Sequence, residues 1–556
     1  MQSRLLIALV IFLSLSLCAT ASGSEDAMAK MSWDLVRTVQ AAERQRGRGE
    51  EVELITAVLL AAHAANNDNL QHLRTLGYSI VGAMGRFILV EAPADYFGDR
   101  ERGLAMLEEI TNASLPPLTL TNANPMTSGS SSIGVDAVWN LGYRGQDTII
   151  AVIDDGFDLD CAELTDRSPQ FHTIIPSREG IGVYSVLPGT ANPSCTHGAK
   201  CALVVSELAP DAELHLLSSP PRTHPLGFLN ALLYATETLH ADVIVTSMEL
   251  TNAYCHNDGT GPVNEIVGDI LQGTSTSLVV AAGNWAGGSH SSHWHYSATY
   301  RDDDGDFHHD FTDNAEDSWD RNTLRFTADK GDRVVIFLEW DDWNVEAHRE
   351  DLDLYILDGT YGVAIAESRA RQYGSSSNPS ERTHHKFEIP ATGTYCIQIR
   401  NEAVATYGED ARPLHFNLYA VNLTNSFTEV EHTTTCGSIR EVATHPAVIS
   451  VGAVSPDDDQ LRGYSARGGG CGGLRKPEVC APDGVYKADD GVFIGTSASA
   501  PYVAGVLALL HSLDPSLAAA DAVALLQETA VISEDNCGNK VYAIDLHAAV
   551  HSLLGK

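Results

Sequence analysis

Apolar and polar positions alternate in blocks along residues 135–285. Short apolar runs such as DTIIAVIDDG (147–156) and SLVVAAGN (277–284) predict buried strands, and longer stretches such as HGAKCALVVSELAP (197–210) predict helices. Strands that alternate with helices at this spacing indicate a parallel sheet covered on both faces. We therefore expect an α/β domain in this part of the chain.

The pattern changes over residues 296–422, where short strands follow one another with turns and almost no helix. Runs such as DRVVIFLEWDD (332–342) and ATGTYCIQIR (391–400) are typical of an antiparallel β-sandwich. The α/β character returns after residue 436 with PAVISVGAVS (446–455) and a long apolar run after Ser497. The sandwich is therefore predicted to be an insertion into one α/β domain made of residues 135–295 and 423–556.

Residues 24–115 have a pattern of their own. LITAVLLAAHAANNDNLQHLRTLGY (54–78) and DRERGLAMLEEI (99–110) predict helices, and SIVGAMGRFILVEAP (79–93) between them predicts strand. A stretch rich in Ser, Thr, Asn, Pro and Gly follows, and it has the composition of an exposed linker at 116–134. We expect a small α+β unit joined to the α/β domain by this linker.

The first 21 residues have the pattern of a secretory signal peptide. Arg4 precedes an apolar run from Leu5 to Leu17, and Ala19-Thr20-Ala21 gives an A-x-A site with cleavage after Ala21. The run is short for a membrane anchor. A lipoprotein signal through Cys18 is another alternative, but the bulky Leu17 stands before it where a small residue is usual. The expected location is secreted, either extracellular or periplasmic, and no later stretch predicts a membrane span.

Charge and cysteine content narrow the picture further. The formal charge is −38, from 35 basic and 73 acidic residues, which disfavours nucleic acid and anionic membrane as partners. Removal of Cys18 leaves nine cysteines in an oxidising compartment, so disulfides are expected and at least one thiol has no partner in the chain. Cys471 and Cys480 could close a small loop, and the absence of CxxC spacing argues against a cysteine zinc site.

Three residues with catalytic chemistry stand at ends of predicted elements: Asp154 after a strand, and His197 and Ser497 at helix starts. A nucleophilic serine needs a base, an imidazole has a suitable pKa, and a carboxylate fixes the imidazole tautomer. A serine at a helix start also faces unpaired N–H groups that favour developing negative charge. Taken singly, each residue also has an ordinary reading: a turn aspartate, a helix-start histidine and an N-cap serine.

Together, the segments AVIDDGFD, HGAKCALVVSELAPDAEL and GTSASAPYVAG resemble, in this order, the aspartate, histidine and serine motifs of the subtilisin-like serine proteases (subtilases). SLVVAAGN resembles the strand that ends in the family's oxyanion asparagine. The resemblance implies a subtilisin-like α/β fold in which Asp154 orients His197, His197 acts as general base and acid, and Ser497 attacks the peptide carbonyl. Asn284 and the backbone N–H of Ser497 would bind the oxyanion.

Some positions depart from the family pattern. Ala199 stands where threonine is usual, and Cys201, one helical turn after His197, is either a small buried side chain, a disulfide partner or a reactive thiol. The substrate-lining strand, usually Ser-Leu-Gly, here reads Ser247, Met248, Glu249, and Ala281, Ala282 and Gly283 are implied to line the same cleft. Glu249 is expected either to favour a basic residue before the cut or to face solvent without effect.

The flanking units also resemble parts of secreted proteases. Residues 24–115 are similar to a pro-domain that would inhibit the enzyme within its own chain, with self-cleavage in the linker at about 115–134. DLDLYILDG and ATGTYCIQIR resemble the pre-peptidase C-terminal domain, a small β-sandwich. The insert could bind material or gate the cleft, or it could be a passive spacer.

No cofactor is required by this chemistry, although one loop suits calcium. RDDDGDFHHD (301–310) places carboxylates at Asp302, Asp304 and Asp306 around a glycine, and hard cations prefer such oxygens. The full EF-hand spacing is absent, so a solvated acidic loop is the other interpretation.

The predicted function is a secreted serine endopeptidase, made as a zymogen, that hydrolyses peptide bonds of proteins through an acyl-enzyme. The alternative is a catalytically inactive, subtilase-like secreted binding protein in which the sandwich carries the function. An acyl transferase or cyclase keeps the same site, but nothing in the sequence indicates that water is excluded.

Overall fold

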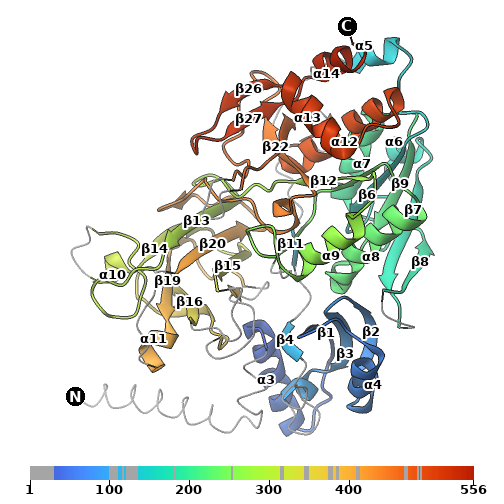
Figure 1. The fold of residues 1–556 in the computed structure, drawn as a ribbon. Coiled ribbons are helices and arrows are strands. Elements are labelled where there is room, and N and C mark those ends of the chain that lie inside the picture. Colours follow the sequence, from blue (N-terminus) through green and yellow to red (C-terminus); the bar gives the residue numbers. More distant parts are fainter. Residues whose placement is uncertain are drawn as a thin grey trace, which may run out of the picture.

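The structure is a computed structural model that describes residues 31–98, 110–114, 118–120, 135–178, 182–251, 255–313, 318–342, 350–372, 380–382, 387–407, 414–468, 474–484, 487–488 and 491–555. These residues form an N-terminal α+β unit, a central α/β unit and a β-sandwich (Figure 1). The predicted signal peptide, the predicted helix at 99–110 except Ile110, and the linker except residues 118–120 lie outside the described residues.

A ten-stranded sheet is the centre of the α/β unit, with the order β26-β27-β23-β22-β12-β10-β6-β9-β7-β8. Neighbours from β27 to β7 are parallel, whereas the edge strands β26 and β8 are antiparallel to theirs. The strands are β6 (Ile149–Asp154), β7 (Gln170–Pro176), β8 (Tyr184–Pro188), β9 (Glu213–Ser218), β10 (Val243–Thr246), β12 (Ser277–Ala281), β22 (Ile449–Val454), β23 (Val479–Pro482), β26 (Val531–Glu534) and β27 (Lys540–Ala543). The predicted parallel sheet is therefore confirmed.

Helices cover both faces of this sheet, which explains the continuous apolar runs. Along β6, Ile150 and Val152 face one layer, and Ala151 and Ile153 face the other. The first layer holds α5 (Val135–Asn140), α7 (Thr196–Leu208), α12 (Thr496–Leu513), α13 (Ala519–Thr529) and α14 (Leu546–Leu553), and the second holds α8 (Leu226–Leu233) and α9 (Pro262–Leu271). In the described part of the chain, none of the helices combines the length and apolarity that crossing a bilayer requires.

The N-terminal unit is a four-stranded antiparallel sheet with the order β2-β3-β1-β4. Its elements are α3 (Trp33–Gly47), β1 (Leu54–Ala61), α4 (Asn67–Thr75), β2 (Ser79–Met84), β3 (Phe87–Pro93) and β4 (Ile110–Ser114). One face of the sheet, with Val58 and Leu89, packs against α8 and α9, and the other face packs against α3 and α4. The helix predicted over 54–78 is confirmed in α4 but wrong over residues 54–61, because an apolar run that is buried on both faces has no period that separates strand from helix.

Two antiparallel sheets share one core in the sandwich, with the orders β13-β20-β15-β18 and β17-β16-β19-β14-β21. The strands are β13 (His293–Thr299), β14 (Leu324–Ala328), β15 (Val334–Trp340), β16 (Leu352–Asp358), β17 (Ala364–Ser368), β18 (Ser380–Arg382), β19 (Gly393–Asn401), β20 (His415–Asn422) and β21 (Glu429–Val430). The sheets thus begin before residue 296 and end beyond residue 422. Figure 1 shows the sandwich beside the α/β unit, with the N-terminal unit below both.

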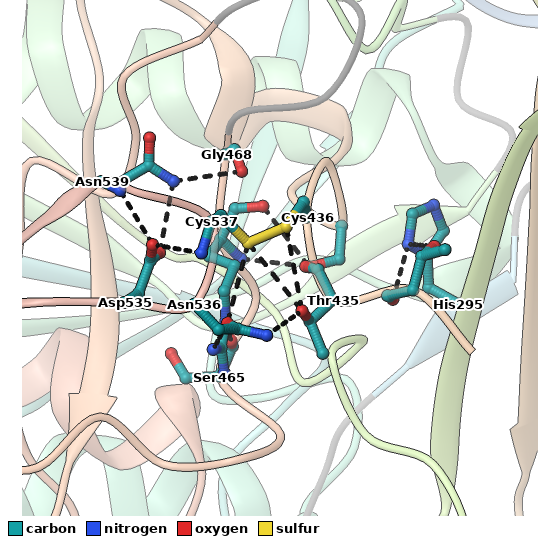
Figure 2. Close-up of a disulfide and its surroundings, with 12 residues drawn as sticks. His295, Thr435, Cys436, Ser465, Gly468, Asp535, Asn536, Cys537 and Asn539 are labelled. Atoms are coloured by element: carbon teal, nitrogen blue, oxygen red, sulfur yellow. Dashed lines mark hydrogen bonds between the residues drawn. A yellow bond between two sulfur atoms is a disulfide. The ribbon is translucent and has the colours of Figure 1, made fainter.

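A disulfide joins Cys436, which follows the sandwich, to Cys537 in the turn between β26 and β27 (Figure 2). Thr435 Oγ1 beside it accepts a hydrogen bond from Asn536 Nδ2 at 2.8 Å. The possible pairing of Cys480 with Cys471 is not formed, because Cys480 is a buried free thiol; Cys471 lies outside the described residues. The chain leaving the sandwich is thereby fixed to the edge of the central sheet.

Candidate active site

The last residue of β6 and the second residue of α7 meet at the carboxyl edge of the sheet. His197 Nδ1 lies 2.8 Å from Asp154 Oδ2, and both side chains are buried. Asp154 Oδ1 accepts the backbone N–H of Asp155 at 2.9 Å, so the carboxylate is held in one orientation. A carboxylate at Nδ1 fixes the imidazole tautomer and leaves Nε2 to act as a base.

Gly198 allows α7 to approach β6 this closely. A β-carbon at this position would overlap the carbonyl oxygen of Gly156 and lie 2.9 Å from Asp154 Cβ. Neither atom belongs to the far end of a flexible side chain, so neither can move aside cheaply. The Asp154–His197 contact therefore depends on glycine at position 198.

Ser497 is the second residue of α12 and is almost fully buried. Its hydroxyl donates to the carbonyl oxygen of Ser247 over 3.5 Å, and its own carbonyl accepts the Ser247 hydroxyl at 3.1 Å. The thiol of Cys201 also lies 3.5 Å from the Ser497 carbonyl, and within 4.8 Å of ligand atoms of Asp154 and His197. Ser497 is thus brought to the same edge of the sheet as the Asp154–His197 pair.

The imidazole is left with one nitrogen for catalysis. Among the described residues, His197 Nε2 is buried and has no hydrogen-bond partner. The ring of Phe493, just before α12, packs edge-on against the imidazole at 5.8 Å between centroids. His197 Nε2 and the Ser497 hydroxyl are therefore not hydrogen-bonded to each other in this structure, since the hydroxyl donates to Ser247.

Asn284 is oriented by the residue before Ser497. Its Oδ1 accepts both the backbone N–H and the hydroxyl of Thr496, at 3.1 and 3.2 Å. Because the oxygen is occupied, the amide Nδ2 remains as the donor, and it lies against Gly495. Thr496 was not identified from the sequence, although its position in GTS, next to the serine, was the available signal.

The strand predicted to bind substrate is already paired. β11 (Glu249–Thr251) pairs antiparallel with β5 (Leu118–Leu120), so that Glu249 lies opposite Leu120. Met248, Ala281 and Ala282, which were predicted to line the cleft, bury their side chains in the hydrophobic core. Contact of these three residues with a substrate would therefore be made by the backbone.

The expectation that the Glu249 side chain faces solvent is wrong, and its preference for a basic residue before the cut stays a prediction. The residue is only 8% exposed, and Glu249 Oε2 accepts the indole N–H of Trp285 at 2.6 Å. Burial raises the pKa of this carboxyl to about 7, although Arg440 and the Trp285 hydrogen bond act in the opposite direction. The carboxyl group is therefore turned toward Trp285 and away from solvent. Trp285 and Arg440 had no recognisable signal in the sequence.

Cys201 is a free, buried thiol, which agrees with the interpretation as a small core side chain and excludes a disulfide at this position. Burial raises the pKa of the thiol, and the nearby Asp154 carboxylate raises it further. A thiol with a raised pKa is a poor nucleophile, because the thiolate is the reactive form. The interpretation of Cys201 as a reactive thiol near the site stays a prediction.

The acidic loop after β13 is closed by its own hydrogen bonds. Oxygens of Asp302, Asp304 and Asp306 lie within 4.8 Å of one another. The Asp302 carboxylate accepts the backbone N–H groups of residues 305–307 at 2.8 to 3.1 Å. Calcium binding at this loop stays a prediction, and the loop does not contribute to the Asp154–His197 edge.

Comparisons with known proteins agree with the fold. Residues 419–543, which include β22, β23 and the whole of α12, match the sequence model of the subtilase family. A comparison with curated proteins gave no match. The CspB protease of Clostridium perfringens has a similar structure, with a TM-score of 0.52, 15% identity, and coverage of 76% of this chain and 98% of that one.

Two further solved structures are more distant. Fervidolysin from Fervidobacterium pennivorans, a keratinolytic enzyme related to subtilisin, gives a TM-score of 0.44 at 14% identity, covering 90% of this chain and 61% of that one. The epidermin leader peptide processing serine protease of Staphylococcus aureus gives 0.45 at 12% identity, covering 91% and 99%. Residues 419–543 thus match the subtilase family model, and the fold of the chain is similar to that of a known protease.

Proposed function

We propose that this protein is a subtilisin-like serine peptidase, a secreted endopeptidase that cleaves proteins through an acyl-enzyme formed on Ser497. The observation that carries the proposal is the buried 2.8 Å contact between Asp154 and His197, at the sheet edge where α12 presents Ser497. The Ser497 hydroxyl now donates to Ser247, so the proposed attack requires that the hydroxyl leave this bond and turn to His197 Nε2. Catalytic hydrogen bonds of this kind are often long before substrate binds.

In the first half of the reaction, Ser497 Oγ attacks the peptide carbonyl carbon and His197 Nε2 takes the hydroxyl proton. Asp154 stabilises the resulting imidazolium. The carbonyl oxygen becomes an oxyanion, which Asn284 Nδ2 and the backbone N–H of Ser497 would bind. When the peptide C–N bond breaks, His197 gives its proton to the leaving amine, and a water molecule then hydrolyses the ester by the same route.

Labelling with a fluorophosphonate tests the nucleophile. We expect the processed protein to be labelled and Ser497→Ala to lose the label. Ser206→Ala is the matched control, because Ser206 is a second buried serine on α7 whose hydroxyl donates to the carbonyl of Leu203 at 3.0 Å. Loss of label in Ser206→Ala instead would overturn the assignment, and an unlabelled, folded wild type would indicate an inactive, subtilase-like binding protein.

We also propose that the N-terminal unit inhibits the enzyme until it is cleaved. Support comes from β5, which occupies the edge of β11, and from the sheet of this unit, which packs on α8 and α9. A substrate strand that needs the same edge would have to displace β5. N-terminal sequencing should find the mature start within a few residues after Leu120, and Ser497→Ala should remain at full length. Equal processing of the Ser497→Ala variant would show that another protease makes the cut.

The same proposal includes three further points. They are secretion through the signal peptide at residues 1–21, calcium binding at Asp302, Asp304 and Asp306, and the likeness of the sandwich to the pre-peptidase C-terminal domain. The mass of the secreted form would show removal of the signal and retention of the insert. A thermal shift on addition of EGTA, lost in Asp302→Asn, would report calcium at the loop.

A further inference from the structure

The strand β15 of the sandwich is buried along its whole length on both faces. Ile336 and Leu338 face the core between the two sheets, whereas Val335 and Phe337 face outward. The outward residues form a cluster with Trp285, the residue that follows Asn284. The outer face of the sandwich is therefore a packing surface for the loop that carries the proposed oxyanion donor.

Trp285 is held from two sides. Its ring packs edge-on against Tyr419 and Phe337 of the sandwich, with centroids 5.2 and 6.4 Å apart. Its indole N–H donates to Glu249 on β11. The side chain is fully buried, so the sandwich and the substrate-side strand together determine where the indole lies.

A buried cation completes this contact. The Arg440 guanidinium lies 4.3 Å from the Tyr419 ring centroid and 5.3 Å from that of Trp285. It forms ion pairs with Glu339 on β15 and, at 2.9 Å, with Glu441. A buried guanidinium that has carboxylate partners is retained in one place, because moving it would leave charges without a partner. The aromatic cluster is thereby locked against the α/β unit.

The other end of the same turn reaches the nucleophile. Gly283 has φ +97°, and a β-carbon there would lie 2.5 Å from Glu249 Oε1, so the turn wraps closely around this carboxylate. The Gly283 N–H donates to Thr496 Oγ1 at 3.1 Å, next to Ser497. Residues 283–285 therefore connect the start of α12 to the outer face of the sandwich.

We propose that Trp285 is a positioning residue for Asn284, and that the inserted sandwich is a working part of the oxyanion site. The indole, fixed between Glu249 and the sandwich, sets the direction of the turn and hence of Asn284 Nδ2. This inference rests on the proposed function, in which Asn284 binds the oxyanion.

The test compares transition-state and ground-state binding in Trp285→Phe of the full, processed protein. Phenylalanine keeps an aromatic ring but removes the N–H to Glu249. We expect kcat to fall about ten- to hundredfold, since a shift of about 1 Å in a catalytic group costs up to about 100-fold. KM should change by less than about twofold, because only the oxyanion needs Asn284. A peptide aldehyde, which forms a tetrahedral adduct with Ser497, should lose the same factor in affinity, whereas the matching peptide amide should not.

Two controls separate positioning from general destabilisation. Trp294→Phe alters a buried tryptophan in the sandwich core whose Nε1 has no hydrogen-bond partner among the described residues, and it should leave kcat unchanged. Glu249→Gln keeps an acceptor for the indole N–H of Trp285, whereas Glu249→Leu does not. The kcat of Glu249→Gln should therefore be at least about ten times that of Glu249→Leu. This comparison also tests the inference if Trp285→Phe fails to fold.

The inference is overturned if Trp285→Phe and Glu249→Leu keep the wild-type kcat, or if aldehyde and amide lose affinity equally. Failure of the proposed function has a different signature, because the wild-type protein itself would then not react with a fluorophosphonate.

Discussion

Gly198 and Gly283 stand where one added carbon atom would separate groups that the site needs in contact. Gly198 lies within α7 and keeps Asp154 beside His197, while Gly283 adopts a left-handed conformation and keeps the oxyanion turn on Glu249. The first is required for space alone, and the second for both space and backbone conformation. The proposed catalytic geometry thus depends on residues that take no part in the chemistry.

Gly198→Ala should inactivate the enzyme. The added methyl group would push α7 from β6 and lengthen the His197–Asp154 contact, and removal of a triad aspartate in related enzymes costs about 10⁴-fold in kcat. We expect a fall of about 10³- to 10⁴-fold, measured as kcat on a peptide substrate. Gly463→Ala is the control, because no atom lies within 4 Å of the β-carbon position there. Normal turnover by Gly198→Ala would contradict the role given to this contact.

The buried carboxyl group of Asp353 should make the stability of the folded protein depend on pH. Burial and the neighbouring Asp351 raise the pKa of the Asp353 carboxyl to about 7, against about 4 in an unfolded chain. Between these values the folded state binds more protons, so this group makes the protein less stable as pH rises from about 4 to 7.

Asp353→Asn removes that effect and keeps an acceptor for the Tyr355 hydroxyl, which now donates to Asp353 Oδ2 at 3.0 Å. The Tm of the variant should exceed that of the wild type, and this difference should be larger at pH 8 than at pH 5 by about 2 °C or more. Thermal unfolding at several pH values measures it, and a difference that does not change with pH would refute the assignment.

Sequence motifs located Asp154, His197 and Ser497 because each stands in a short segment with its own local pattern. Trp285 and Arg440 have no such pattern, since their roles come from contacts with residues far along the chain, whereas Thr496 lies in the same short segment as Ser497 and was overlooked. Glu249 shows the limit most clearly: the sequence placed it on the correct strand but could not show that its side chain turns toward Trp285.

At the scale of elements, apolar runs predicted the strands of the central sheet because both faces of that sheet are covered. The same signal misassigned β1, where LITAVLLA is buried on both faces and therefore has no alternation. The run VVIFLEW of β15 was predicted only as a sandwich strand, although its continuous apolar pattern also carried information about the outer face of the sheet. A sandwich strand with one solvated face alternates, so a continuous apolar run indicates that the outer face is also covered.

The disulfide ties two elements that are distant in sequence, and its removal should cost stability. Cys436 and Cys537 are 101 residues apart, and linking residues across such a separation removes much of the entropy of the unfolded chain. Cys537→Ser should lower the unfolding free energy by about 2–5 kcal/mol, seen as a lower Tm.

Cys161→Ser, at a free cysteine, is the control for this substitution. A reducing agent should lower the Tm of the wild type and of Cys161→Ser but leave that of Cys537→Ser unchanged. An equal response in all three proteins would count against the bond.

At the scale of the whole molecule, negative charge is in large excess. Thirty-five basic residues cannot pair with 73 acidic ones, and the net charge of −38 repels itself in the compact state. Raising NaCl from 0.1 to 1 M shortens the screening length from about 10 Å to about 3 Å. The Tm should therefore rise with salt at pH 8 and rise less at pH 4.5, where part of the carboxylates are protonated. A Tm that falls with salt at pH 8 would show that ion pairs outweigh the repulsion.

The position of α12 near the end of the chain has a consequence for biosynthesis. This helix fills one layer over the central sheet and carries Ser497 of 556 residues, so a ribosome releases β6, α7 and the whole sandwich before the nucleophile exists. Under the proposed function, a nascent chain therefore has no hydrolytic activity toward its surroundings until this segment is made. Its sheet also stays open on one side until the segment of α12 emerges, so the apolar side chains of that face are exposed in the unfinished chain.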